Sequence, residues 1–183
     1  MDRRPIVVTD YDPIWPQRFE MLRAHVWPAV SDFALRVEHV GSTSVPGLAA
    51  KPIIDMSIVL RSEAEAPLAI ERLAGLDYRH LGNLDIEGRE AFRAPASLPP
   101  HNLYVCHEGS IGIVNQVAVR DYLRTHPEVA RRYGALKKQL AERFPDDMES
   151  YVFGKTDLIL EILREVGFDQ DTLAKIEGVN RRS

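Results

Sequence analysis

Residues 36–60 constrain the fold more than any other stretch of this 183-residue chain, because two apolar segments flank a short polar break there. The β-branched side chains of Val37 and Val40 predict a short strand over residues 36–40. Residues 52–60 form a second, strongly apolar run that predicts another strand. Between them, residues 45–50 predict one helical turn. The stretch therefore predicts two strands in close succession, joined by a compact connection.

The break is a glycine followed by three hydroxyl residues, Gly41-Ser42-Thr43-Ser44. Glycine lets the backbone turn sharply and approach a ligand closely. Successive N–H groups in such a turn can surround an anion, and the hydroxyl groups add further donors. The same composition is also that of an ordinary turn. The residues alone therefore leave two readings, a phosphate-binding bend or a plain connection.

Asp55 stands in the middle of the second apolar run. Side chains alternate across a strand, so residues 53, 55, 57 and 59 share one face and residues 54, 56, 58 and 60 share the other. An ionised carboxylate on a mostly buried strand needs a cation, a set of donors or an open cleft. A phosphate-binding bend beside such a carboxylate is what metal-assisted phosphoryl chemistry requires. A structural role for Asp55 in capping or pairing is the alternative.

Composition narrows the class of protein. The chain is 45% hydrophobic and 27% charged, with a net charge of −4 that argues against a general nucleic-acid binder. The single cysteine, Cys106, excludes an internal disulfide and fits a reducing compartment. The sequence shows neither a run of about 18 apolar residues nor a signal peptide, so we expect a cytoplasmic protein without a membrane partner.

The remaining pattern alternates helices and strands before becoming helical. A helix is predicted from Pro13, kinked or ended by Trp27-Pro28, and another from the Ser62–Glu65 capping box to about residue 74. Residues 77–81, 91–94 and 101–107 predict strands, with a polar loop at 82–89 that carries Asp85 and Glu87. Helices are predicted over the last third, where Lys137 is assigned with other cations to a solvated helix side.

Three further side chains are candidates for a site. Lys155 falls on the buried stripe of the final helix, so it must snorkel, pair with a carboxylate or reach into a cleft. His101 opens a strand. If that strand lies beside Asp55, His101 can bind a phosphate or a metal, and the alternative is a hydrogen-bonded structural histidine. Arg93 lies in the preceding predicted strand and can neutralise an anion.

The segment from Glu38 to Asp55, E-H-V-G-S-T-S-V-P-G-L-A-A-K-P-I-I-D, closely resembles the signature of the GrpB family. That family resembles a branch of the nucleotidyltransferase (polymerase-beta-like) superfamily. Weaker landmarks extend the resemblance over most of the chain: Tyr11 to Phe19, His101 to Val105, Arg120 to Arg124 and Tyr151 to Lys155. The resemblance implies an α+β fold, in which a small mixed β-sheet is flanked by helices and followed by a C-terminal helical portion. It implies a single domain over 1–183, with a core of about 1–114 and a helical portion of about 115–183.

The superfamily pattern is a Gly-Ser or Gly-Gly pair, a spacer and then an acid-x-acid dyad on one strand face. Here Gly41-Ser42 matches the pair and Asp55 the first acid, but Ser57 stands at the second position. The resemblance implies that Asp55 is catalytic and coordinates Mg²⁺, with Ser57 as a weak ligand. A hydroxyl does not supply the negative charge that a hard cation favours, so this departure puts the metal site in question.

Two functions follow as expectations. In the first, a nucleotide or phosphorylated small molecule binds in the cleft and, if the protein is an enzyme, undergoes Mg²⁺-dependent nucleotidyl transfer. Residues 41–44 hold phosphate, and the candidates to neutralise its charge are Lys51, Arg93, His101 and Lys155. In the second, the protein is a non-catalytic binding or regulatory module that lost the metal dyad. A third and weaker expectation is a partner domain of a cofactor-biosynthesis enzyme, since GrpB-like domains also occur fused to dephospho-coenzyme A kinase. The oligomeric state stays open.

Overall fold

The computed structural model of the chain describes residues 5–180. Its elements follow in chain order: α1 (Trp15–Val30), β1 (Ala34–Val40), η1 (Ser42–Ser44), β2 (Ile54–Leu60), η2 (Glu63–Glu65), α2 (Ala66–Ala74), β3 (Arg79–Gly82), β4 (Arg89–Arg93), β5 (His101–His107), α3 (Ile111–Thr125), α4 (Pro127–Arg143), α5 (Met148–Glu165) and α6 (Gln170–Asn180). Among these residues, no helix is long and apolar enough to cross a membrane.

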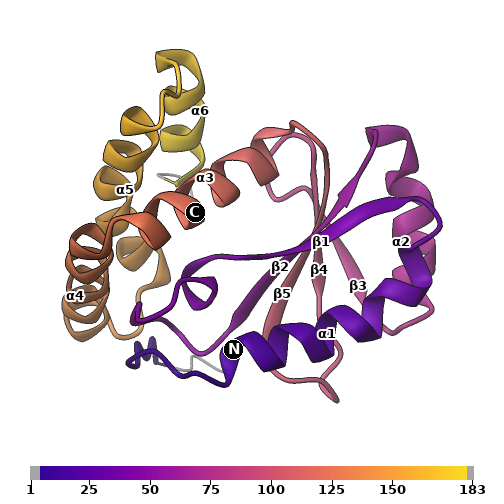
Figure 1. The fold of residues 1–183 in the computed structure, drawn as a ribbon, viewed down its shortest axis with the longest axis horizontal. Coiled ribbons are helices and arrows are strands. Elements are labelled where there is room, and N and C mark those ends of the chain that lie inside the picture. Colours follow the sequence, from indigo (N-terminus) through magenta and orange to yellow (C-terminus); the bar gives the residue numbers. More distant parts are fainter. Residues whose placement is uncertain (1–4, 181–183) are drawn as a thin grey trace.

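Five strands form one sheet in the order β1-β2-β5-β4-β3 (Figure 1). The central pair, β2 and β5, is parallel, and the other three pairs are antiparallel. In the parallel pair Asp55 lies opposite Asn102, and in the pair β1–β2 it lies opposite Val40. The predicted α+β fold with a mixed sheet is confirmed. The pairs β1–β2 and β2–β5, which join the strands farthest apart in sequence, both include Asp55.

One face of the sheet is covered by α1 and α2. The core on this side contains Ile54, Met56, Ile58 and Leu60 of β2, as their alternation predicts. They pack against the apolar stripe of α1: Trp15, Phe19, Leu22, Val26 and Val30. Pro28 does not end this helix, which continues to Val30 and closes with a hydrogen bond from Ser31 N–H to the Trp27 carbonyl.

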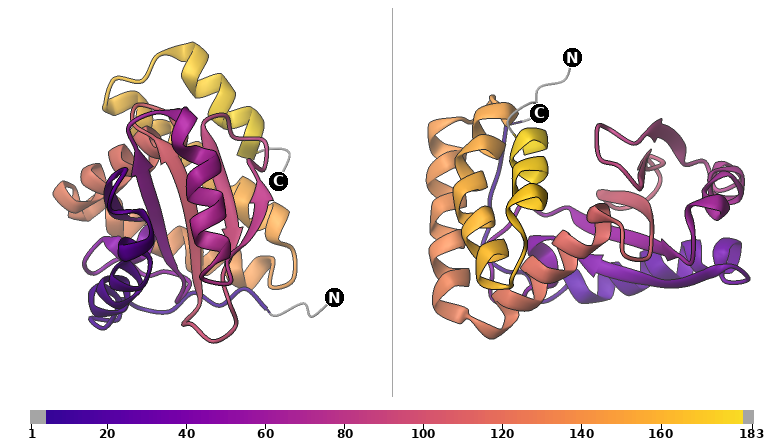
Figure 2. Two further views of the ribbon diagram at one scale, coloured as in Figure 1. Left: turned by 90° about the vertical axis from the view of Figure 1, so that its right-hand side faces the viewer. Right: turned by 90° about the horizontal axis from the view of Figure 1, so that it is seen from above.

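The other face carries the Asp55 side of β2 and is covered in part by α3. Ile113 and Val117 of α3 pack against Val40, Val59 and Cys106 of the sheet. Helix α3 then leads to α4, α5 and α6, which stack against one another beside the sheet (Figure 2). The helical portion thus begins on the sheet face that bears Asp55, which places its side chains within reach of that carboxylate.

The connection between β1 and β2 differs from the predicted one. Residues 45–50 form no helical turn; the turn is a single 3₁₀ turn at Ser42–Ser44. Beyond it, Ala50 pairs with Thr9 in an isolated antiparallel bridge. In this bridge the N–H and C=O groups of Ala50 bond to Thr9, so the Ala50 N–H does not close a helical turn over residues 45–50. The bridge also joins the segment before α1 to the connection between β1 and β2.

Candidate functional site

The bend at residues 41–44 is held by its backbone conformation and by side-chain hydrogen bonds to its carbonyl groups. Gly41 has φ 69° and ψ −175°, a backbone region that is essentially restricted to glycine. The Ser44 hydroxyl donates to the Gly41 carbonyl at 2.5 Å. From α3, Arg124 donates two hydrogen bonds to the Ser44 carbonyl, at 3.0 and 2.8 Å. The bend is therefore fixed both by a glycine-only conformation and by the guanidinium of α3.

The three hydroxyl groups of the bend have different surroundings. Thr43 Oγ1 lies 3.0 Å from Nε2 of His39, and burial with the nearby Arg124 and Arg120 lowers the pKa of His39 to about 4. A neutral His39 therefore shares a hydrogen bond with Thr43 at pH 7. Ser42, which hydrogen-bonds Tyr133, faces the cavities described below. The bend thus offers Ser42 to a ligand, while Thr43 and Ser44 largely serve the local structure.

Asp55 lies against the bend. A Cβ atom on Gly41 would come within 2.3 Å of Asp55 Oδ2, so only a glycine leaves room for the carboxylate. Asn102 Nδ2 donates to Asp55 Oδ1 at 2.7 Å from the neighbouring strand. Burial raises the pKa of Asp55, while the Asn102 hydrogen bond and then the charges of Lys51, Lys155 and Lys137 lower it. The structure therefore brings the glycine bend and the strand carboxylate into direct contact.

Two cavities meet at Ser42, Asp55 and Lys155. The smaller, about 190 Å³, is lined by polar groups that include Lys51, Lys137 and Asn102. The larger, about 280 Å³, extends between the sheet and the helical portion, and its lining adds the following residues: Tyr104, Gln116, Val119, Arg120, Tyr133, Val152 and Ile159. The cleft is therefore cationic at one end and mixed apolar and polar at the other.

Three lysines approach Asp55 from different elements. Lys51 and Lys155 lie over the ring of Tyr151, with Nζ at 5.6 and 4.6 Å from its centroid. Lys137 Nζ lies 4.5 Å from the centroid of Tyr133 and donates to the Ala49 carbonyl. Burial lowers the pKa of all three amines, that of Lys155 to about 8 and that of Lys137 to about 6. Ring faces attract ammonium groups, which helps to hold these cations close together.

Lys137 corrects the sequence interpretation. The sequence predicts Lys137 on the solvated side of its helix, yet the residue is only 2% exposed. It follows Tyr133 by four residues and precedes Leu140 by three, so it lies on the buried stripe of α4. The spacing argument that singled out Lys155 would have found Lys137 as well. The sequence does not single out Asn102, because it does not show which of the two neighbouring strand residues, His101 or Asn102, lies on the same face as Asp55.

The buried amine of Lys137 predicts a dependence of stability on pH. Its pKa of about 6 in the folded protein is below the ordinary value of 10.5, so between about pH 6 and 10 the unfolded chain binds the extra proton and stability rises with pH. Lys137→Met should reduce that slope by up to about 1.4 kcal/mol per pH unit in urea unfolding. Four other ionisable groups face the Lys137 amine and influence its charge: Lys155, Asp55, Lys51 and Tyr133. Lys138→Met, next to it and exposed, should leave the slope unchanged; parallel curves for wild type and Lys137→Met would contradict the expectation.

The residues present do not form a site for a resident Mg²⁺ ion. Among residues 5–180, no group of three or more His, Cys, Asp or Glu side chains is placed to hold a metal. Ser57, at the second position of the expected dyad, is fully buried and donates its hydroxyl to Gln116 Oε1 at 3.1 Å. The lone carboxylate of Asp55 has lysines rather than acids around it. Since Mg²⁺ favours anionic oxygen ligands, this donor set suits an anion better than a divalent cation.

Three of the predicted phosphate-binding residues line neither cavity: Ser44 of the bend, His101 and Arg93. His101 pairs with Ile54, not Asp55, and so points to the opposite face of the sheet. There it is 6% exposed, with Nε2 at 2.7 Å from Tyr78 Oη and Nδ1 at 2.7 Å from the Pro99 carbonyl. Arg93 is the exposed last residue of β4 and lines neither cavity. Of the predicted anion-binding residues, the structure brings Gly41, Ser42, Thr43, Lys51 and Lys155 to the cleft.

The chain is similar to known proteins both in sequence and in fold. Residues 5–165 match the family described as "GrpB protein". The UPF0157 protein YqkA of Bacillus subtilis is 33% identical over 157 residues, which cover 86% of this chain and 46% of YqkA. This chain therefore spans about half the length of that relative.

Solved structures agree with the sequence comparison. The conserved protein GrpB from Enterococcus faecalis superposes with a TM-score of 0.79 at 34% identity, covering 92% of this chain and 98% of that one. The GLD-2/RNP-8 complex matches with a TM-score of 0.53 at 17% identity, covering 88% of this chain and 63% of that one, which shows a shared fold alone. The chain thus has a nucleotidyltransferase-like fold and belongs to the GrpB family.

Proposed function

We propose that the cleft binds a phosphate ester, such as a nucleotide, and that lysine side chains rather than a divalent cation balance its charge. One observation carries the proposal: Lys51, Lys137 and Lys155 converge on the cavity that also contains Ser42 and Asp55. Buried amines with no equal number of carboxylates are costly unless an anion joins them. An incoming phosphate would restore the pKa values of these amines toward ordinary lysine values, so binding takes up protons at neutral pH.

Each group has a distinct part in this binding. Lys155 lines both cavities and so reaches the junction at which phosphate and the rest of the ligand meet. The amines of Lys51 and Lys155 both lie over the Tyr151 ring, which helps to keep the two charges close to the cavity. Ser42 adds a hydroxyl, and Gly41 allows the bend to approach the ligand without a side chain in between. Asp55 keeps the lysines together in the absence of ligand.

This role for Asp55 gives a test with a definite sign. Asp55→Asn removes a negative charge from an anion site and keeps an oxygen for Asn102, so pyrophosphate without metal should bind about 3- to 10-fold more tightly. Isothermal titration calorimetry in EDTA measures the change. Asp10→Asn, which removes the same charge from an exposed residue, is the control and should leave affinity unchanged. Weaker pyrophosphate binding by Asp55→Asn would overturn the proposal.

Mg²⁺-dependent nucleotidyl transfer is the second candidate, favoured by the contact of the Asp55 carboxylate with the Gly41 bend. It makes the opposite prediction for the same variant. Nucleotide binding that requires Mg²⁺ in wild type and is lost in Asp55→Asn would support the metal-dependent reaction. Binding that is equal in EDTA and in Mg²⁺, and that survives Asp55→Asn, supports metal-independent binding by the lysines.

A further inference from the structure

Lys155 of α5 lies where the two ends of the cleft meet. Among residues 5–180 it is the one lysine that lines both cavities, whereas Lys51 and Lys137 line the smaller cavity only. Apolar side chains of α3 and α5 also line the larger cavity: Val119, Val152 and Ile159. A ligand whose phosphate occupies the smaller cavity therefore presents its next few atoms to the Lys155 amine.

The surroundings of Lys155 favour a neutral amine. A lysine acts as a nucleophile only when it is unprotonated. Burial and then the charge of Lys51 lower the pKa of Lys155 to about 8, while the charge of Asp55 opposes this shift. About one Lys155 amine in ten is therefore neutral at pH 7. A desolvated lysine beside a second cation is an arrangement that activates lysines toward carbonyl groups.

The other two lysines of the cleft are less suited to attack a ligand. Lys137 has the lower pKa, about 6, but its amine donates to the Ala49 carbonyl and the residue is only 2% exposed. The Lys51 amine lies 3.7 Å from the sulfur of Met148 and reaches only the smaller cavity. Both amines are placed to hold a phosphate, which leaves Lys155 to face the rest of the ligand.

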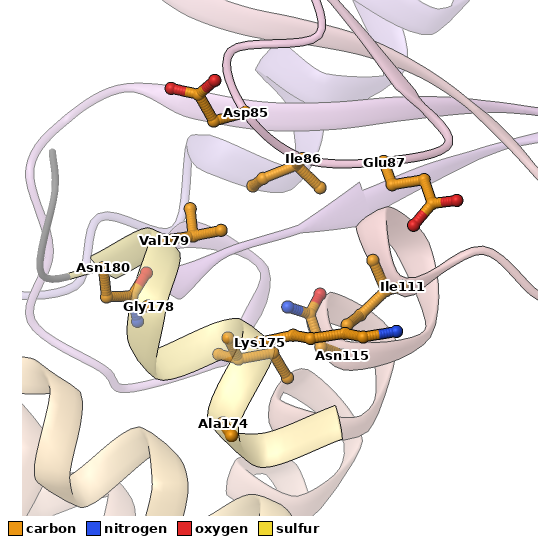
Figure 3. Close-up of a pocket in the computed structure, with 11 residues that line it drawn as sticks. Asp85, Ile86, Glu87, Ile111, Asn115, Ala174, Lys175, Gly178, Val179 and Asn180 are labelled. Atoms are coloured by element: carbon orange, nitrogen blue, oxygen red, sulfur yellow. The ribbon is translucent and has the colours of Figure 1, made fainter. Parts of the chain in front are cut away.

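A lysine in a neighbouring cavity lacks these features. Lys175 of α6 lines a cavity of about 390 Å³ beneath the loop that joins β3 to β4 (Figure 3). That loop contributes Asp85 and Glu87 to the same cavity, and Lys175 is exposed. Carboxylates disfavour a phosphate, so an anionic reagent is not drawn to this lysine. Lys175 therefore serves as a reference amine within the same chain.

We propose that Lys155 forms an imine with a phosphate ester that carries an aldehyde group, while Lys51 and Lys137 bind its phosphate. The proposal rests on the proposed phosphate-binding function and adds a covalent step to it. The nitrogen lone pair of the neutral amine attacks the carbonyl carbon, and the new C–N bond gives a carbinolamine. Loss of the carbonyl oxygen as water then forms the C=N bond, and both hydrogens of that water come from the amine. The step is reversible and involves no oxidation or reduction.

The bound phosphate assists this step by position. It holds the aldehyde beside the amine, so a bimolecular encounter becomes an intramolecular reaction. The protonated imine keeps the positive charge of the lysine and is attracted to the phosphate as the ammonium is. A phosphate near Lys155 also raises the pKa of its amine, so the gain in rate comes from placement and not from greater nucleophilicity.

Pyridoxal 5′-phosphate is the probe, because it carries both an aldehyde and a phosphate, and pyridoxal is its counterpart without phosphate. The full chain is incubated with either reagent at neutral pH, imines are reduced with sodium borohydride, and labelled lysines are identified by peptide mass spectrometry. With pyridoxal phosphate, Lys155 should be labelled at least about 10-fold faster than Lys175. Pyrophosphate should suppress the labelling of Lys155 alone. With pyridoxal, the preference for Lys155 should fall below about 3-fold.

Two variants check the assignment. Lys155→Arg keeps the positive charge but cannot form an imine, so it should lose the label at this position and still bind pyrophosphate within about 3-fold of wild type. Lys175→Arg is the matched control and should leave the labelling of Lys155 unchanged. Peptide mapping of wild type compares the two lysines without any variant, so the comparison does not depend on the folding of Lys155→Arg.

The outcomes separate the imine from the proposed function. If pyrophosphate binds but Lys155 is labelled no faster than Lys175, the imine is wrong and the phosphate site stands. If both reagents label Lys155 preferentially and at equal rates, and pyrophosphate does not compete, the phosphate proposal fails and the reactive amine stands. If wild type shows neither a labelling preference nor pyrophosphate binding, both are overturned.

Discussion

Gly41→Ala is expected to lower the free energy of unfolding by about 3 kcal/mol, the largest stability effect that we expect from a single methyl group in this chain. Two causes add. The backbone at φ 69° and ψ −175° strains any residue with a Cβ, and the new methyl group would come within 2.3 Å of Asp55 Oδ2. Urea unfolding monitored by circular dichroism measures the loss.

Gly47→Ala separates these two causes. Gly47 also has a positive φ, 79°, but a Cβ there meets nothing within 4 Å, so only the backbone strain of about 1 kcal/mol remains. The double variant Gly41→Ala/Asp55→Ala should recover part of the loss, because the carboxylate that clashes is gone. Equal effects at positions 41 and 47, without recovery in the double variant, would show that the contact with Asp55 contributes nothing.

Lys155→Gln is expected to weaken pyrophosphate binding by about 10- to 100-fold, the range for one charge-assisted hydrogen bond. Lys155 is chosen because it lines both cavities and, with a pKa of about 8, is mostly protonated at pH 7. Lys137, with a pKa of about 6 and a hydrogen bond to Ala49, contributes less charge before the ligand arrives. Calorimetry in EDTA at pH 7 measures the affinities.

Lys138→Gln is the matched control. Lys138 lies on α4, faces solvent and pairs with the exposed Asp10, so its loss changes the net charge equally without touching the cleft. Affinity should be unchanged in this variant. Similar weakening in Lys138→Gln and Lys155→Gln would mean that overall charge, not the cleft, determines binding.

The sheet strand that bears Asp55 could be predicted well because its signal is local. Alternation along residues 54–60 separates the apolar face that meets α1 from the face that carries Asp55 and Ser57, and the structure follows it. The glycine of the bend was also predictable, since it stands directly after a strand and before three hydroxyl residues. Both features depend on neighbours within a few residues of one another.

What could not be predicted depends on register between distant segments. Nothing near His101 in the sequence says that it pairs with Ile54, and this register alone turns His101 away from Asp55 and brings Asn102 to it. A shift by one residue would exchange their roles. The hydrogen bond from Ser57 to Gln116 could not be predicted for the same reason, because Gln116 lies 59 residues away in the sequence, on α3.

The clamp between Arg124 and the Ser44 carbonyl has a mechanical consequence. Helix α3 continues into α4 and α5, which carry Lys137 and Lys155, so these lysines and the bend belong to one linked body. A hinge motion that tilts the helices away from the sheet would have to break both bonds to Ser44 or carry the bend along. Capture of a ligand is therefore expected to proceed by rotation of lysine side-chain torsions over a fixed backbone, on the nanosecond scale of side-chain motion rather than the slower one of domain closure.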